Sequence, residues 1–353
     1  MSQRRFTKTE TGVLGVLTSP QGKAMLMVAL LVLTAGCMGV LDDDDAATPG
    51  AEPLDTVPEG VDGVAFFSGE IVQDQATEEL MNGGIERVQQ FDPAYDGPEN
   101  WNAALAEFED ETEIRVEGFQ SALMFFQEDG ADLQDEYAGV IVQSTWSSDE
   151  IETAFDEEPQ TDTYNGVTVW IEEDQITDEE TWTADLGDGT YVFGDQQAVQ
   201  DAIDTFQGDT AAFSGELRNA YESADDGLMK MAVAVPDEEF DDVAFDIEIM
   251  TMSYFTDGSQ MNTQAQFTMG SEEDAENAAG MINFGLNEFK NQLEMEGEDE
   301  LVDMIERLEI QTQDNQLRAT FSTTPDEILE AFDEFMMGMG AGTQFSVQPQ
   351  ASA

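Results

Sequence analysis

This sequence is first informative through what it lacks, because it contains no His, a single Cys and very few basic residues. The 353-residue chain has 11 Lys and Arg against 78 Asp and Glu, so its formal net charge is −67. Without His there is no Ser-His-Asp triad and no zinc site with a His ligand, and one Cys cannot form an internal disulfide. The negative charge excludes nucleic-acid binding through a basic surface, and attachment to an anionic membrane requires a hydrophobic or lipid anchor.

The imbalance of charge indicates adaptation to concentrated salt. Charged residues make up 25% of the chain, which is ordinary, but most of them are acidic. In about 0.1 M salt their repulsion opposes compaction, whereas in about 1 M salt the screening length falls to about 3 Å. Hydrophobic residues make up 41%, which is enough to build a core and argues against disorder. The composition resembles that of proteins from extreme halophiles, the haloarchaea in particular.

The N-terminus has the parts of a secretory signal, in which basic residues precede a short apolar run. The run begins at Ala24 and ends in the segment Leu33–Cys37, with the sequence Leu-Thr-Ala-Gly-Cys. This segment resembles a lipobox, which implies that Cys37 is lipidated and becomes the first residue of the mature protein. An uncleaved membrane anchor is the alternative, since residues 24–41 are 18 uncharged residues, near the lower limit for a spanning helix.

Both alternatives place most of the chain outside the cytoplasm, because positive charge precedes the apolar run and four Asp follow it. Arg4 and Arg5, followed by Phe6, favour a twin-arginine export signal. We therefore expect a protein at the outer face of the cell membrane, held there by the lipid on Cys37. No nucleic acid and no cofactor is expected, and the ligand or protein partner stays open.

The expected fold class is α+β. Residues 1–36 are predicted to be the signal peptide, and residues 37–62 the lipidated Cys with a disordered acidic linker. Residues 63–227 and 228–337 are predicted to form two similar units of antiparallel sheet with packed helices, before a flexible tail over 338–353. Alternating patterns predict strands, and helical spacing predicts helices over 100–110, after Asp195, from Ser214 and from Ser271. The expected strands cover 61–67, 116–126, 137–145, 164–171, 228–235, 243–255, 261–269, 308–312 and 317–323, and residues 185–194 are expected to form a hairpin corner that runs into a strand.

One internal repeat suggests that the two units are related. The pattern Asp-Glu-Ile-x-x-Ala-Phe-Asp-Glu occurs at 149–157 and again at 326–334. Each copy follows an expected strand and opens with a capping box, Ser147 with Glu150 and Thr324 with Glu327. Chance similarity is the alternative, because the chain is rich in acids throughout. The stretch Tyr164–Phe206 is similar to uncharacterised secreted prokaryotic domains, a resemblance that implies a fold and no activity.

No residue can be assigned to catalysis or to metal or cofactor binding from the sequence. Too many carboxylates are present to select a glycosidase pair, and a turn is favoured over a calcium loop at Asp185–Asp188. Core packing is favoured over a binding role for the clustered methionines and for the tryptophans. These residues are Met336, Met337, Met339, Trp101, Trp146, Trp170 and Trp182.

The composition and the anchor favour a non-enzymatic binding or envelope-interaction module. A solute-binding lipoprotein of a membrane transporter is the alternative, since such proteins commonly use this anchor. Against it, the expected strands form antiparallel hairpins rather than the βαβ units of two hinged lobes. A carboxylate- or metal-dependent hydrolase is the third hypothesis.

Overall fold

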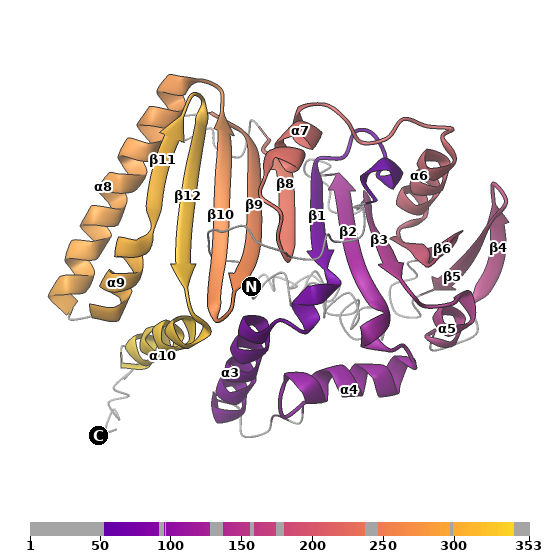
Figure 1. Ribbon diagram of the computed structural model, residues 1–353, viewed down its shortest axis with the longest axis horizontal. Coiled ribbons are helices and arrows are strands. Elements are labelled where there is room, and N and C mark those ends of the chain that lie inside the picture. Colours follow the sequence, from indigo (N-terminus) through magenta and orange to yellow (C-terminus); the bar gives the residue numbers. More distant parts are fainter. Residues whose placement is uncertain are drawn as a thin grey trace, which may run out of the picture.

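The computed structural model describes residues 53–91, 95, 97–127, 137–155, 159–173, 180–236, 246–296 and 299–341. Within them, twelve antiparallel strands form one continuous sheet in the order β11-β12-β10-β9-β8-β1-β2-β3-β7-β6-β5-β4 (Figure 1). The strands are β1 (Gly63–Ser68), β2 (Phe119–Gln127), β3 (Tyr137–Ser144), β4 (Gln160–Tyr164), β5 (Val167–Glu173), β6 (Glu180–Gly187), β7 (Thr190–Gly194), β8 (Met229–Ala234), β9 (Ile247–Asp257), β10 (Gln260–Met269), β11 (Glu309–Gln313) and β12 (Gln316–Thr323).

Helices cover both faces of this sheet, which confirms the α+β class. Short 3-10 helices precede or connect the main elements: η1 (Leu54–Thr56), η2 (Gly69–Val72) and η3 (Val116–Gly118). The α-helices are α3 (Gln75–Phe91), α4 (Trp101–Thr112), α5 (Ser148–Thr153), α6 (Gln196–Gln207), α7 (Glu216–Ser223), α8 (Glu272–Glu296), α9 (Asp299–Arg307) and α10 (Pro325–Ala341). In Figure 1, α6 and α7 lie at one end of the strands, α3, α4 and α10 lie at the other, and α8 flanks the β11 edge.

The two faces of the sheet carry separate hydrophobic clusters. One face, here called the α6 face, packs Phe66, Leu123 and Ile141 against Val199 and Ile203 of α6. The opposite face, here called the α3 face, packs Phe67, Ala122 and Tyr254 against Leu80 of α3 and Trp101 of α4. Because side chains alternate along a strand, neighbouring residues such as Phe66 and Phe67 enter different clusters. The sheet is therefore buried on both sides through its centre.

Each half of the sheet has the same strand order. One half reads β1-β2-β3-β7-β6, with β5 and β4 added at its edge, and the other reads β8-β9-β10-β12-β11. The halves meet where β1 pairs with β8 in antiparallel fashion. In each half three neighbouring antiparallel strands are followed, after at least one helix, by a hairpin whose second strand pairs with the third of them, and a helix follows that hairpin. The first half differs by the insertion of α3 and α4 between β1 and β2 and of the β4–β5 hairpin after α5. The predicted boundary between residues 227 and 228 stays a prediction, but the halves on either side share this topology.

The repeated sequence motif does not lie at equivalent places in the two halves. Its first copy opens α5 after the third strand of one half, β3, and its second copy opens α10 after the hairpin strand β12. The topological counterpart of α10 is α6, which follows β7. Both copies do form the predicted capping boxes, through Ser147 with Glu150 and Thr324 with Glu327. The motif thus marks the same kind of strand-to-helix corner in both places. The two halves resemble each other in strand order, and the motif does not mark equivalent positions in them.

The folded body begins earlier than the predicted linker boundary. Leu54, Val57 and Val61 are buried in the α6-face cluster, although they belong to the segment 37–62 that we expected to be disordered. Apolar side chains spaced among acids were sufficient to dock this segment against α6. At the other end, α10 continues to Ala341, past the predicted start of the flexible tail at residue 338. The remainder of both predicted segments lies outside the described residues.

Candidate functional site

The residues that the sequence singled out for export and anchoring lie outside the described part of the chain. These are Arg4, Arg5 and Cys37. Within the described ranges, no helix combines the length and the apolar character needed to cross a bilayer. In the same ranges, no group of three or more His, Cys, Asp or Glu side chains is placed to hold a metal ion.

The aromatic and acidic candidates are part of the architecture. Trp101, Trp170 and Trp182 are buried in three different clusters, so they line no common cleft. Asp185 caps its own turn, because its Oδ1 accepts from the Gly187 amide at 2.9 Å. The preference for core packing and for a turn is confirmed at these positions. The side chains of Met336, Met337 and Met339 lie outside the described residues.

The few basic residues mainly form ion pairs that link one secondary-structure element to another. Arg87 of α3 binds Asp333 of α10 at 2.6 Å, and Arg218 of α7 binds Asp55 of η1 at 3.1 Å. Lys290 of α8 pairs with Glu306 of α9. A cation that links two acidic elements removes repulsion where they meet, which matters most in a chain of this charge. Most cations that composition retained are therefore engaged within the fold.

Lys230 is a buried member of this group. Its ammonium pairs with Asp226 at 2.9 Å and lies 4.7 Å from the centre of the Tyr221 ring. A buried lysine needs such compensation because removal from water disfavours its charged form. The contact holds α7 against β8 on the α6 face.

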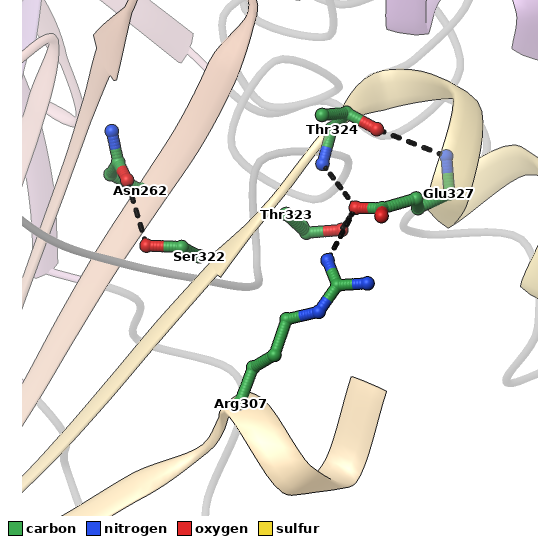
Figure 2. A network of polar contacts seen from close by, with 6 residues as sticks. All are labelled: Asn262, Arg307, Ser322, Thr323, Thr324 and Glu327. Carbon is green, nitrogen blue, oxygen red and sulfur yellow. Dashed lines mark hydrogen bonds and ion pairs between the residues drawn. The ribbon is translucent and has the colours of Figure 1, made fainter. Parts of the chain in front are cut away.

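The corner between β12 and α10 holds a dense polar network (Figure 2). The Glu327 carboxylate accepts hydrogen bonds from the Thr324 amide at 3.0 Å, from Thr323 Oγ1 at 3.1 Å and from Arg307 Nη1 at 2.7 Å. The bond from Arg307 is the largest cause that lowers the pKa of Glu327 to about 2. Arg307 lies at the end of α9, so this carboxylate joins α9, β12 and α10.

Other shifted groups also have structural roles. The pKa of Glu150 is lowered, first by its hydrogen bond from the Ser147 amide in the capping box of α5. Burial raises the pKa of Tyr254 to about 12, and burial with the nearby Asp201 raises that of Tyr137. Stabilised carboxylates and protonated buried phenols are what a packed, capped fold requires. These shifts identify no acid and base pair.

One part of the α6 face differs from the rest because it is polar and almost free of carboxylates. On β9 and β10, buried polar side chains replace the apolar cluster beyond Ile249. The register of the strands continues this surface across β12 to β11 at the edge. We call it the polar platform, and its members are Thr251, Ser253, Asn262, Gln264, Gln266, Gln316, Arg318, Thr320, Ser322, Glu309, Gln311 and Gln313.

Burial falls steadily across the polar platform toward the edge of the sheet. Gln264 and Gln266 on β10 are buried, Arg318 on β12 is half-buried, and Gln311 and Gln313 on β11 are exposed. Arg318 Nη2 donates to Gln266 Oε1 at 3.3 Å, which connects the buried part to the half-buried part. Ser322 Oγ donates to Asn262 Oδ1 at 3.0 Å across the same strands (Figure 2).

Two properties make the polar platform the best candidate for binding. Glu309 is its only carboxylate, whereas acids dominate the chain as a whole. In addition, Gln311 and Gln313 on β11 are exposed, so their amide groups are accessible to a partner. Amide side chains offer both donors and acceptors, so the platform can engage a neutral hydrogen-bonding surface. This site was not predicted from the sequence, in which its signal is the recurrence of Gln, Asn, Ser and Thr between residues 251 and 268 and again between 311 and 323.

Comparisons with known proteins identify no family. No family model matches the sequence, and no curated protein matches it. Similar solved structures include crystal form III of TP0453, with a TM-score of 0.47 and 10% identity, covering 81% of this chain and 99% of that chain. Crystal forms I and IV of TP0453 give TM-scores of 0.46 and 0.45 at 10% identity, each covering 80% of this chain and 97% and 96% of theirs. A likeness at this level establishes neither a family nor an activity.

Proposed function

We propose that this protein is a lipid-anchored extracytoplasmic module of a halophile that binds a polar component of the cell envelope without catalysis. Cys37 carries the lipid in this proposal, and the body stands in brine beyond an acidic linker. The observation that carries the binding role is the polar platform, a hydrogen-bonding surface on a chain whose net charge is −67. The partner we expect is neutral and rich in hydroxyl or amide groups, such as an envelope glycan.

The charge of the chain supports this class of partner. A polyanionic partner would be repelled by the acidic surroundings of the platform. In molar salt the screening length is about 3 Å, so negative charges that come into direct contact still repel each other. Neutral hydrogen bonds are unaffected by that repulsion and are each worth about 1 kcal/mol. A platform of amides therefore suits recognition in concentrated salt.

The topology weighs against the solute-capture alternative. Proteins that close two lobes on a small solute need two bodies joined by a hinge, and here all described strands belong to one sheet. The exposed part of the polar platform also lies on β11, the edge strand of that sheet. An exposed edge strand suits an extended surface or polymer better than an enclosed small molecule.

The binding role is tested by sedimenting the purified protein with isolated haloarchaeal envelopes in molar KCl. Joint replacement of Gln311→Glu and Gln313→Glu extends the acidic surface over the exposed platform and is expected to weaken binding about thirtyfold, through the loss of two hydrogen bonds of about 1 kcal/mol each. The matched control is Gln160→Glu, because Gln160 is an exposed glutamine on β4, the opposite edge strand. Equal effects of the two changes, or no binding by the unmodified protein, would refute the role of the platform.

Anchoring is tested separately in cells. The Cys37→Ser variant is expected to be released from the membrane or to remain unprocessed. Retention in the membrane with unchanged mass would instead support the spanning alternative over residues 24–41. This outcome leaves the platform experiment interpretable, since binding is measured with purified protein.

A further inference from the structure

The sheet ends in two edge strands, β11 and β4, and each presents backbone groups that no neighbouring strand uses. In an antiparallel hairpin with a two-residue turn, the residues that flank the turn form a hydrogen-bonded pair, and hydrogen-bonded and non-bonded pairs alternate from there. In the β11–β12 hairpin the flanking pair is Gln313 with Gln316. The N–H and C=O groups of Ile310 and Thr312 therefore point away from β12, toward the open side of the sheet.

The outward side of β11 carries none of the features that protect an edge strand. Natural edge strands are commonly blocked by Pro, by charged side chains or by bulges. Residues 310–313 read Ile-Gln-Thr-Gln, without Pro and without charge. Within the described part of the chain, the Ile310 and Thr312 amides donate to no other group. Although α8 flanks this edge in Figure 1, Gln311, Thr312 and Gln313 are exposed.

The other edge strand, β4, is blocked at the corresponding positions. The same alternation, counted from the turn of the β4–β5 hairpin, makes Thr161 and Thr163 the outward residues of β4 and Pro159 the next outward position. Pro159 has no N–H, and the Thr163 amide donates to Asp162 Oδ1 at 2.7 Å. An added strand would have to displace the Asp162 carboxylate and would find no donor at Pro159. The chain thus closes one end of its sheet and leaves the other end open.

The first half of the sheet shows what covers an edge of this kind. Strands β6 and β11 hold equivalent places, because each is the first strand of the hairpin that follows the three neighbouring strands of its half. Asp188 and Asp314 also come first in the two hairpin turns, both with positive φ. The outer side of β6 is covered by β5, an antiparallel strand of the inserted β4–β5 hairpin. The described residues of the second half contain no such hairpin, so the place that β5 fills beside β6 is open beside β11.

We propose that β11 accepts an extended segment of a partner protein, which adds to the sheet as an antiparallel strand beside Ile310 and Thr312. In this mode of recognition main-chain hydrogen bonds supply affinity, and alternate side chains supply specificity. Ile310 and Thr312 each offer one donor and one acceptor to such a strand. The inference goes beyond the binding role of the polar platform, since it uses the backbone of β11 rather than its side chains.

The two faces of β11 define the side chains that the partner strand needs. On the α6 face the new strand lies beside Glu309, Gln311 and Gln313 of the polar platform, so amides and hydroxyls suit it there and acids do not. On the α3 face it lies beside Thr312 and Ile310, and Ile310 packs against the apolar cluster that α8 helps to form. Apolar side chains suit that face. Strand β12, on the inner side of β11, has the same alternation of polar and apolar residues.

A labelled synthetic peptide of residues 316–323, the sequence of β12, serves as the probe for this edge. Its binding to the full chain is followed by fluorescence anisotropy in molar KCl. We expect saturable binding that Thr312→Pro weakens at least tenfold, because proline removes an outward donor and obstructs the approach of a strand. The inner ladder is retained in this variant, since the Thr312 amide points away from β12. The matched control, Thr161→Pro, makes the same change on β4 and should leave binding unchanged.

Amide hydrogen exchange of the unmodified chain tests the same edge without a proline. The bound peptide should slow exchange at Ile310 and Thr312 and leave the Thr161 amide unchanged. The proposal is overturned by a peptide that does not bind saturably, or by proline variants that weaken binding equally or not at all. It is also overturned if concentrated protein alone protects Ile310 and Thr312, which would assign the edge to a second copy. None of these results bears on the polar platform, whose test compares glutamine side chains on envelopes.

Discussion

Replacing Arg87 by Gln should loosen the attachment of α10 to α3. Arg87 Nε donates to Asp333 Oδ1 at 2.8 Å and Nη2 donates to Asp333 Oδ2 at 2.6 Å, while Nη1 donates to the Gly83 carbonyl at 3.0 Å. This bidentate pairing of Nε and Nη2 with the two carboxylate oxygens is the strongest form of ion pair between side chains. The ion pair also holds α3 and α10 close together at Gly83. The helices approach so closely there that an added Cβ at Gly83 would lie 2.1 Å from Leu329 Cδ1 of α10.

The expected loss follows from these contacts. Arg87→Gln removes two charge-assisted hydrogen bonds and a neutral one, and the freed Asp333 carboxylate, with a side chain 40% exposed, regains water. We expect the free energy of unfolding to fall by about 2 kcal/mol for Arg87→Gln and by about 1 kcal/mol for Asp333→Asn. The coupling energy in a double-mutant cycle should be about 1 kcal/mol. Because the Arg87–Asp333 hydrogen bonds are shorter than the screening length of about 3 Å, most of this coupling energy should persist in molar salt.

Urea unfolding in molar KCl, followed by tryptophan fluorescence, measures these differences. The control cycle uses Arg218→Gln and Asp55→Asn, because the Asp55 side chain is 89% exposed and its coupling should stay below about 0.5 kcal/mol. A coupling for Arg87 and Asp333 no larger than in the control would refute the view that these cations tie acidic helices together.

Two further predictions concern solvent conditions. Because the folded pKa of Glu327 is lowered to about 2, its contribution to stability is full above the ordinary carboxyl pKa and is lost as pH falls from about 4.5 through about 2. With that side chain 31% exposed, the contribution to stability is about 1 kcal/mol, so acid titration should destabilise the unmodified protein more than Glu327→Gln. An equal loss of stability in the two proteins would contradict the role of this carboxylate. Transfer to about 0.1 M salt should abolish the near-ultraviolet circular dichroism signal as repulsion unfolds the body, and a full signal there would contradict salt adaptation.

Local structure was largely predictable from the sequence because its signals are local. Asp195 accepts from the Ala198 amide at the start of α6, as the pattern predicted, and Gly208 ends that helix in the left-handed conformation. The strand expected over 164–171 corresponds to β5, but the segment before it, β4, was missed since its residues are mostly exposed and polar. Helix α3 was missed as well, because Gly83 and Gly84, which have low helix propensity, lie within it.

The candidate site was less accessible to sequence reasoning. The members of the polar platform lie on β9, β10, β11 and β12, and they form one surface only through the pairing register of those strands. Each Gln or Thr, taken alone, resembles the polar side of an ordinary half-exposed strand.

The amino-acid sequence alone established the charge, the hydrophobic content, the α+β class, the helix caps and most strands, because these depend on composition and on residues a few positions apart. It also supplied the predictions for Cys37 and for salt adaptation, which rest on no tertiary contact. The tertiary structure decided that the two halves join in one sheet through β1 and β8, that residues 53–62 belong to the body, and which polar and apolar side chains share a surface. Those outcomes depend on which distant segments pair through their backbones and bury each other's apolar side chains. Such pairing is not visible in a short window of sequence, because the partners lie far apart in the chain.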